Sequence, residues 1–421
     1  MRIAFVGNQD NNAYRLCKWV RQAGYDARLY MFRQERGPRS RPELVDPQLG
    51  EHGENYPSWI QPYDDTRDRL SLVLPSRLAK RIETDVDVVV TSGATGLLAA
   101  RHFRKAPVVH LSLGSEIAEF PLLLWRWRVS PPWRAVAWLA RRAIRHVRKI
   151  VEVYVRSLRT LDRLGQLDKV VLWGFPEDMQ GNRSRVDAQM LAELTARYAP
   201  YQGVFLWLTR LNMADPNSTE YKAADRFLEA FEKVVHQHRF KVRAIVGRHG
   251  SDLEGFQRRV VEKGLADHVD YVDHLPYRQV LTYASVPNVT VFDVPDVEMG
   301  GTLGGVAREA VSVGAVVVEG LDEELMKLVF GEGCPVLNSP DAQGCYEAMV
   351  RLLTMTPAQR DQLRGEIARW ASAHLDWPVR VEQFIAILRS VVYCHQVPAM
   401  MAAWSRRDPQ AMARVVPKDA L

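Results

Sequence analysis

Several features that mark particular classes of protein are scarce or missing in this chain of 421 residues. It has only four cysteines, with no Cys-X-X-Cys pair and no histidine at zinc-finger spacing: Cys17, Cys334, Cys345 and Cys394. This pattern argues against a disulfide framework and against a structural zinc site, and we expect no metal. No apolar run approaches the roughly 20 residues that cross a bilayer. The chain also contains no low-complexity tract and no short repeat.

The amino-terminal residues lack the apolar stretch of a signal peptide. Residues 1–7 lead directly into the polar run Asn8-Gln9-Asp10-Asn11-Asn12. We therefore expect an unexported protein, in keeping with scattered cysteines in a reducing cytoplasm.

Positive charge is present but unevenly distributed. The net charge is +6, and residues 101–149 alone hold eleven Lys or Arg and two Glu, which gives this window +9 and the remainder −3. A concentrated basic patch indicates a nucleic acid, a membrane surface or an anionic substrate as partner. No RRM, helix-turn-helix or zinc-finger signature accompanies the charge, so we expect no nucleic acid.

Hydrophobic patterning predicts an α/β protein. Short β-branched runs alternate with amphipathic stretches, as parallel sheets covered on both faces require. In the first half we predict strands at residues 2–7, 27–32, 86–91, 108–111, 150–155 and 170–172, and helices at 12–23 and 133–150. The Pro-rich residues 37–57 are predicted to form a long loop.

The same alternation restarts after residue 177. Strands are predicted at 204–208, 242–246, 269–272, 289–292 and 315–318, and helices at 223–237, 253–263, 305–312 and 345–353. Two such arrays predict two Rossmann-like domains, residues 1–174 and 175–375, with Trp173-Gly174-Phe175-Pro176 as the hinge. A helix from 376 to 392 has no strand partner, and we expect residues 376–421 to pack back on the N-terminal domain.

Ligands of open α/β sheets bind beyond the carboxyl ends of the strands, so the loops there are the first candidates. Arg210 follows the strand at 204–208, and Lys222 opens the next helix. An arginine fork and a lysine charge can converge on a diphosphate, although each alone is more often a solvated surface charge.

Two glycine-containing turns follow other strands. Gly247-Arg248-His249-Gly250 allows a close approach of backbone to a ligand, and an ordinary strand-to-helix turn explains it equally well. The run Gly300-Gly301-Thr302-Leu303-Gly304-Gly305 precedes a helix whose N-terminus favours an anion, with Glu309 one turn further on as an acceptor for hydroxyl groups.

In the first half, His110 lies at the end of a predicted strand and Gly114-Ser115-Glu116 follows. An isolated histidine at such a position is more often structural than catalytic. It is retained as a candidate because we expect the carboxyl ends of the two sheets to face each other across a cleft.

The order of these pieces resembles the retaining glycosyltransferases of family 4, which have the two-domain GT-B fold. The likeness covers most of residues 200–355 and rests on Thr209-Arg210-Leu211, Lys222, Val246-Gly247-Arg248-His249-Gly250, Gly264-Leu265-Ala266-Asp267-His268-Val269 and Glu309-Ala310. Gly114-Ser115-Glu116 is similar to the Gly-Ser-Asp of that family.

The resemblance implies roles for these residues. Arg210 and Lys222 would stabilise the departing diphosphate, and His110 would contact the donor or the oxocarbenium centre. Donor binding would involve Gly247, Arg248, Glu298, Gly301, Thr302, Leu303, Gly304 and Glu309, the last on the ribose hydroxyls. The family has a second acidic residue eight positions before that Glu, where this chain has Gly301, with Glu298 as the nearest substitute.

Acceptor and membrane contacts are expected on the N-terminal domain. The loop with Asn8, Asn11, Asn12 and Tyr14 either lines the acceptor site or caps the following helix through Asn12. The helix at 133–150 and the segment before it either solvate their basic side chains or lie on anionic lipid, through Trp125, Trp127, Arg134, Trp138, Arg141, Arg145 and Arg148.

The sequence thus predicts a metal-independent retaining glycosyltransferase without a cofactor, in which a nucleotide-diphosphate sugar is the co-substrate. The acceptor would be a cell-envelope or lipid-linked glycan, and the protein would be cytoplasmic, with peripheral attachment to the inner membrane face as an extension. The alternatives are a catalytically silent nucleotide-sugar or glycan-binding subunit, motivated by Gly301, and another GT-B activity such as an epimerase or a phosphorylase.

Overall fold

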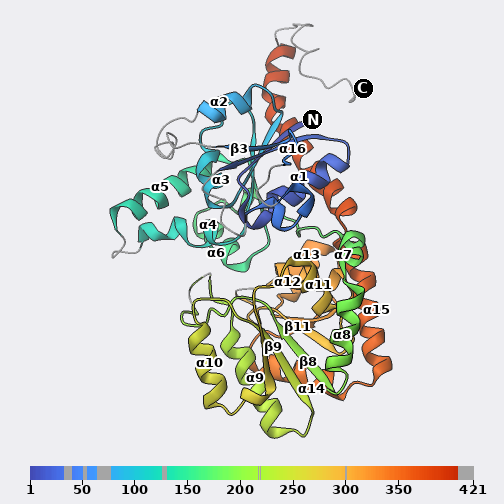
Figure 1. The fold of residues 1–421 in the computed structure, drawn as a ribbon. Coiled ribbons are helices and arrows are strands. Elements are labelled where there is room, and N and C mark those ends of the chain that lie inside the picture. The colour runs from blue at the N-terminus through green and yellow to red at the C-terminus, as the bar shows by residue number, and fades with distance from the viewer. Residues whose placement is uncertain are drawn as a thin grey trace. The chain divides into compact units, whose positions relative to one another are not determined.

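The computed structural model describes residues 1–32, 40–50, 55–63, 77–125, 130–216, 218, 220–298 and 301–405. The chain forms two compact units (Figure 1). Unit 1 contains Met1–Val151, Leu164–Val171 and the described residues from Val381 onward, and unit 2 contains Glu152–Arg163 and Leu172–Arg380.

The sheet of unit 1 has seven strands in the order β3-β2-β1-β4-β5-β6-β7. Their bounds are β1 Arg2–Val6, β2 Asp26–Phe32, β3 Ile60–Tyr63, β4 Val88–Ser92, β5 Val108–Leu111, β6 Lys149–Glu152 and β7 Val170–Leu172. The pairs from β3 through β6 are parallel. Every residue of β4 and β5 is buried, as expected for strands covered on both faces.

The helices of unit 1 are α1 Asn12–Gln22, α2 Arg77–Glu83, α3 Gly93–Ala100, α4 Ser115–Ala118 and α5 Pro131–His146. The C-terminal helix α16, Trp377–Ser405, begins in unit 2 and continues into unit 1. There Phe384 stacks on Phe5 of β1 with ring centroids 6.4 Å apart, and Arg389 donates to the Tyr25 hydroxyl at 2.9 Å. The predicted return of the C-terminal helix to the N-terminal domain is therefore confirmed.

The sheet of unit 2 has six strands in the order β10-β9-β8-β11-β12-β13, and all five neighbouring pairs are parallel. Their bounds are β8 Gly203–Trp207, β9 Val242–Gly247, β10 Val269–Val272, β11 Val289–Phe292, β12 Val316–Glu319 and β13 Leu337–Asn338. Along the chain, β9 and β10 are added on one side of β8, and β11, β12 and β13 are then added on the other side. The order therefore reverses between β8 and β11.

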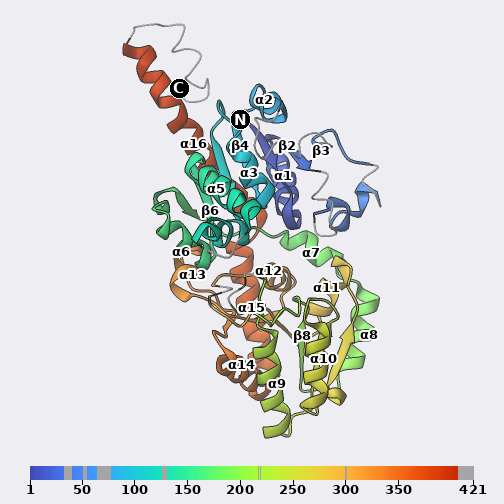
Figure 2. The ribbon, with the colours of Figure 1, turned by 90° about the vertical axis from the view of Figure 1, so that its left-hand side faces the viewer.

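Helices cover both faces of this sheet (Figure 2). Helices α9 and α14 pack together beside α10, whereas α7, α8, α11, α12 and α15 form the other layer. The bounds are α6 Val155–Arg163, α7 Met179–Arg185, α8 Ala188–Tyr198, α9 Ala224–Gln237, α10 Leu253–Glu262, α11 Tyr277–Ala284, α12 Gly305–Ser312, α13 Glu323–Phe330, α14 Ala342–Thr354 and α15 Pro357–His374. Buried aromatic rings join the sheet to α9, with Phe205 and Phe292 5.4 Å apart and Trp207 and Phe227 5.0 Å apart.

Two predicted boundaries are wrong. The helix expected at 133–150 ends at His146, because Val147 has extended backbone angles and β6 begins at Lys149. The strand expected at 150–155 ends at Glu152, whose carboxylate accepts from the amides of Val153 and Tyr154, both at 2.8 Å, and so turns the chain into α6.

The predicted hinge residues 173–176 are packed within unit 2. The Trp173 indole donates to the Arg380 carbonyl at 3.1 Å, and the Arg380 guanidinium donates to the Gly174 carbonyl at 3.0 Å. The structure also contains elements that the sequence pattern does not predict: the strands β3 and β13 and the helices α2, α3, α4, α6, α7, α8, α11, α13 and α15. No helix of the described part of the chain combines the length and the apolar character needed to cross a membrane.

Candidate functional site

The first candidate site is the edge of the unit 2 sheet where the strands end. Parallel strands place their carboxyl ends at one edge, and ligands of such sheets bind where the strand order reverses. Thr209 and Arg210 follow β8, Asp293 follows β11, and Glu319 ends β12. The reversal between β8 and β11 therefore brings these residues to one place.

Arg210 and Lys222 are twelve positions apart in the sequence but close in the structure. The chain leaves the sheet after Asn212 and returns at Lys222, whose amide donates to the Asn212 carbonyl at 2.8 Å. Ala223 follows in a left-handed conformation with φ of 55° and begins α9. Lys222 is partly buried, and its removal from water lowers the pKa of its amine. The charge of Asp293 opposes that shift, and the charge of Arg210 reinforces it.

The loop between Asn212 and Lys222 is held by hydrogen bonds from two other parts of unit 2. Asp252 accepts from the amides of Met213 at 2.7 Å and Ala214 at 2.9 Å. Arg156 of α6 donates to the Pro216 carbonyl at 2.7 Å. Near its end, the exposed carboxylate of Glu220 forms an ion pair with the Arg210 guanidinium. The cation predicted to bind a diphosphate therefore already has an anionic partner.

The turn after β9, residues 247–250, lies farther from the strand-order reversal between β8 and β11. Gly247 is buried, and a β-carbon on it would lie 3.0 Å from two atoms of the His249 ring. Arg248 is exposed and lies over the Tyr271 ring of β10 at 5.8 Å, with Asp273 3.5 Å from its guanidinium. Its contacts are thus with the strand on the far side of β9 from β8.

Gly301 has a backbone that only glycine adopts easily, with φ of 76°. Its amide donates to the Gly320 carbonyl at 2.9 Å, and a β-carbon would lie 2.6 Å from Cγ2 of Val155 in α6. Thr302 and Leu303 are buried. Glu298 forms an ion pair with Arg159 of the same helix, with Nη2 2.7 Å from Oε1. Both predicted donor contacts at this point are therefore engaged by α6.

The start of α12, predicted to favour an anion, already carries two carboxyl groups of the chain. The Gly304 amide donates to Oε1 of Glu319 at 2.8 Å, and the Ala307 amide donates to Oδ2 of Asp293 at 3.3 Å. The Thr209 hydroxyl donates to Oδ1 of Asp293 at 2.6 Å. Burial and the neighbouring charge of Asp293 hold the pKa of Glu319 well above its usual range.

Glu309 lies one turn into α12, as predicted, and is partly exposed. Three residues at this edge, Glu220, Asp293 and Glu319, are not among those predicted from the sequence, and Thr209 is named there only within Thr209-Arg210-Leu211. The sequence does contain a sign of Asp293 and Glu319, because each acid directly follows an apolar run, in Phe292-Asp293 and Val318-Glu319. The same pattern also occurs at ordinary exposed turns.

His110 lies in the interior of unit 1. It is fully buried in β5, with Nδ1 3.1 Å from the Thr91 hydroxyl and Nε2 3.4 Å from Oε1 of Glu116. Glu116 is also fully buried and accepts from the Leu113 amide at 2.6 Å. His110 and Glu116 of the Gly-Ser-Glu segment are therefore in contact and belong to one buried polar cluster.

The asparagine loop after β1 is held by its own side chains. Asn8 is fully buried, accepts from the Tyr14 amide at 2.8 Å and donates to the Ser40 carbonyl at 2.9 Å. Asn11 donates to the Arg41 carbonyl at 2.9 Å, and the Tyr14 hydroxyl donates to Asp46 at 2.7 Å. The predicted cap at Asn12 is wrong, because Asn8 accepts the orphan amide in the first turn of α1.

The basic face of α5 is largely exposed. Trp138 is 51% exposed, and Arg134 and Arg145 of the helix are exposed as well, as is Arg148, which lies just beyond the end of α5. Arg141 is an exception, because its guanidinium donates to the Pro121 carbonyl at 2.7 Å. Trp127 and the side chain of Trp125 lie outside the described residues.

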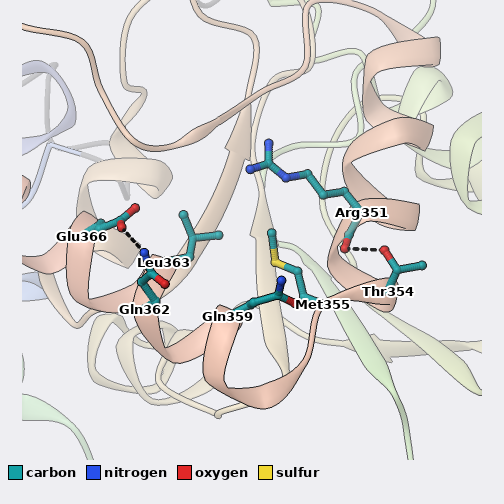
Figure 3. A pocket seen from close by; sticks show the side chains of 7 residues that line it. All are labelled: Arg351, Thr354, Met355, Gln359, Gln362, Leu363 and Glu366. Atoms are coloured by element: carbon teal, nitrogen blue, oxygen red, sulfur yellow. Dashed lines mark hydrogen bonds between the residues drawn. The ribbon is translucent and has the colours of Figure 1, made fainter.

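A separate surface cavity of about 400 Å³ lies between the end of α14 and α15 (Figure 3). Arg351, Met355, Leu363 and Glu366 are among its lining residues. Because α14 starts beyond the carboxyl end of β13 and runs back, this cavity belongs to the opposite edge of the sheet. Within the described ranges, no group of three or more His, Cys, Asp or Glu is placed to hold a metal ion.

Comparisons with known proteins identify the fold. No protein-family model matches the chain, and no sequence among the curated proteins matches it. Among solved structures, HepE of Anabaena in complex with UDP and glucose has a TM-score of 0.63 at 15% identity, over 93% of this chain and 100% of that one. Sucrose-phosphate synthase of Thermosynechococcus elongatus has a TM-score of 0.64 at 13% identity, over 93% and 99%.

A lipopolysaccharide outer core galactosyltransferase, WaaB, is similar with a TM-score of 0.58 at 11% identity, again over 93% and 99% of the two chains. At such identities the likeness shows the fold alone. The prediction of two Rossmann-like domains of the GT-B class is therefore confirmed.

The hydrogen bonds of Asn8 predict a structural role. Asn8→Ala should lower the free energy of unfolding by about 1–3 kcal/mol, because it leaves buried partners unsatisfied. Asn12→Ala, at the first residue of α1, should change it by no more than about 0.5 kcal/mol. Urea unfolding of both variants measures the difference, and equal stabilities would contradict the structural role of Asn8.

Proposed function

We propose that this protein is a retaining glycosyltransferase that moves a sugar from a nucleotide-diphosphate donor to a glycan acceptor. The observation that carries the proposal is the convergence of Arg210 and Lys222 at the strand-order reversal of unit 2. HepE has been solved with UDP-glucose, and the fold likeness covers the full length of that protein. These findings support a nucleotide sugar as the ligand of this edge.

The proposed chemistry is a transfer with retained anomeric configuration. The bond between the anomeric carbon and the diphosphate oxygen breaks, a new bond forms to the acceptor hydroxyl, and the proton of that hydroxyl passes to the departing diphosphate. Negative charge develops on the diphosphate, so fixed cations there stabilise the transition state. Arg210 supplies a planar fork and Lys222 a point charge. Two side-chain cations can provide the charge that a divalent ion provides elsewhere, which supports a metal-independent reaction without a further cofactor.

Glu309, on the exposed side of the first turns of α12, is proposed to accept the ribose hydroxyls. The acceptor is proposed to bind unit 1 and to be a cell-envelope or lipid-linked glycan. The exposed arginines and tryptophans of α5 support this choice, since basic and aromatic side chains bind anionic lipid surfaces.

A catalytically silent nucleotide-sugar-binding subunit is the second candidate, and Gly301 is the observation that favours it. The left-handed backbone and the contact with Val155 leave no room for an acidic side chain at the place where the family-4 pattern has one. Binding of nucleotide sugars without hydrolysis, transfer or epimerisation would identify this function.

The proposed cations predict the effect of their removal. Lys222→Ala and Arg210→Ala should each lower kcat/KM for the donor by about 100- to 1,000-fold, the usual loss when one stabilising donor at a developing charge is removed. Lys233→Ala, a lysine on the outer face of α9, is the matched control and should retain activity. Sugar transfer and hydrolysis across a panel of nucleotide sugars measure the effect. Full activity in both site variants would contradict the proposal.

The ion pair between Arg210 and Glu220 predicts competition with the donor. In the wild type, binding of UDP to Arg210 has to break the exposed ion pair with Glu220, which costs about 0.5–1 kcal/mol. Glu220→Gln removes this cost and should therefore lower the Kd for UDP about two- to fivefold. Glu229→Gln removes an exposed carboxylate that pairs with Lys233 on α9 and should leave the Kd unchanged. Calorimetric titration at low and high salt tests this, with a smaller difference expected at high salt.

The basic face of α5 predicts binding to anionic vesicles. Reversal of Arg134, Arg145 and Arg148 to Glu should weaken sedimentation with phosphatidylglycerol vesicles at least tenfold, since each basic residue near the surface contributes about 1 kcal/mol. Reversal of the exposed Arg239, Arg258 and Arg259 in unit 2 makes the same change in net charge and should have little effect. Equal partitioning of wild type and both variants would contradict attachment through α5.

A further inference from the structure

Helix α12 carries Glu309, the proposed acceptor for the ribose hydroxyls. The helix has only eight residues, Gly305–Ser312, which is about two turns. A helix this short is not stable by itself, so the place of Glu309 depends on the contacts that hold α12. The residue next to Glu309 is Arg308, which is only 8% exposed and faces the interior of unit 2. Its contacts have no part in the function as stated so far.

Arg308 joins the glycine-rich turn to the segment before α7. Its Nη1 donates to the Leu303 carbonyl at 3.0 Å. Leu303 precedes the N-cap residue Gly304, so the hydrogen bonds within α12 leave this carbonyl unused. On the other side, Nε of Arg308 lies 3.5 Å from Oε1 of Glu177 in an ion pair, and the guanidinium carbon lies 5.3 Å from the centre of the Phe175 ring.

Glu177 is itself held firmly and is only 1% exposed. Its amide donates to the Leu375 carbonyl at 2.8 Å, and its carbonyl accepts from the Trp377 amide at 3.0 Å. The second carboxylate oxygen, Oε2, lies 3.5 Å from Nδ2 of Asn182, which also donates to the Ser312 hydroxyl at 2.9 Å. The Glu177 carboxylate is therefore linked to both ends of α12, through the arginine and the turn at one end and through Asn182 at the other.

The ion pair between Arg308 and Glu177 fixes geometry more than it adds stability. A buried pair of opposite charges contributes little net stability compared with apolar side chains of the same volume. The neighbouring Ala307 and Ala310 of α12 are apolar and buried, so an apolar side chain would suit this side of the helix as well. A planar guanidinium, in contrast, reaches the Leu303 carbonyl and the Glu177 carboxylate together only when α12 lies in one position.

We propose that Arg308 and Glu177 are positioning residues for the nucleoside of the donor, because they fix α12 so that Glu309 faces the ribose hydroxyls. The inference rests on the proposed function, which assigns the ribose to Glu309. Arg308 is buried and Glu309 partly exposed, so the arginine acts through the helix and does not touch the donor. The diphosphate is assigned to Arg210 and Lys222, which lie on the connection between β8 and α9.

The test is a double-mutant cycle on nucleoside diphosphate binding, measured by calorimetry on the whole protein. The probes are UDP, ADP and GDP, and the one that the wild type binds most tightly is used for all variants. Arg308→Ala and Glu177→Gln should each raise its Kd about tenfold, as expected for residues that act on a site without touching the ligand. Wild-type affinity in both variants would overturn the inference.

The second arm of the cycle shows whether Arg308 acts through Glu309. Glu309→Ala should weaken binding by itself. Arg308→Ala added to Glu309→Ala should have no further effect, because the helix then carries no group for the ribose. Additive losses would overturn the inference, since they would show that Arg308 acts on the site in some other way.

Arg364→Ala is the matched control for a general loss of stability. Arg364 of α15 donates to the Gly314 carbonyl at 3.2 Å, just beyond the other end of α12, and to the Pro287 carbonyl at 3.0 Å. Its removal should lower the free energy of unfolding but leave the Kd unchanged. A rise in Kd equal to that of Arg308→Ala would overturn the inference, because any loosening of α12 would then be sufficient.

A further variant keeps the proposal testable if Arg308→Ala does not fold, since that change leaves Glu177 as an uncompensated buried charge. Arg308→Met combined with Glu177→Gln removes both charges and nearly keeps the volume. This double variant lacks the hydrogen bond to the Leu303 carbonyl and should show the same rise in Kd. Wild-type affinity in it would overturn the inference.

The two proposals fail differently. A wild-type protein that binds none of the three nucleoside diphosphates overturns the proposed function and the inference with it. Wild-type affinity in Glu309→Ala overturns the assignment of the ribose, and the inference falls with that assignment. Binding that depends on Glu309 but not on Arg308 or Glu177 overturns the inference alone.

Discussion

The parallel pairing of β8 with β11 and of β11 with β12 is the constraint on which the candidate site depends. Because these three strands run in one direction, Thr209, Asp293 and Glu319 all leave the sheet at the same edge. The 2.6 Å hydrogen bond from Thr209 to Asp293 joins two strand ends that are 84 residues apart in the sequence. The strands themselves are held by buried aromatic rings, so the charged groups rest on a rigid core.

Exposed and buried carboxylates at this edge serve different purposes for an energetic reason. Glu220 is exposed, so its ion pair with Arg210 exchanges easily for another anion. Asp293 is buried and fully hydrogen-bonded, and removal of its partners would leave an uncompensated charge inside the protein. One carboxylate can therefore give way to a ligand, whereas the other has to stay in place when the ligand binds.

The sequence predicts those parts of the structure that depend on local pattern. Apolar runs of four or five residues locate most strands, and Arg210 and Lys222 become candidates because they flank such a run and the helix after it. The convergence of these two residues depends on a backbone hydrogen bond between Lys222 and Asn212, which no periodicity encodes.

The sequence does not predict the buried carboxyl pair, because an acid after an apolar run is usually exposed. Glu319 ends a buried strand, and the Gly304 amide of the glycine-rich turn donates to its carboxyl group. The same holds for Asn8. From the sequence it is a polar residue that could bind a ligand, but in the structure its side-chain amide donates to the carbonyl of Ser40, 32 positions away. Short elements such as β13, with two residues, carry too little pattern to be recognised.

Gly301 illustrates how packing can account for a departure from a sequence pattern. The resemblance predicts an acid there, and its absence alone suggests lost function. In the structure, however, this backbone passes against Val155, and Arg159 of the same helix pairs with Glu298. Helix α6 belongs to unit 2 although it precedes the second sheet in the sequence. A side chain at position 301 would have to displace Val155 and adopt a left-handed backbone, so the glycine here goes together with the close approach of α6. A carboxylate for the donor sugar, if the reaction needs one, has to come from another backbone position.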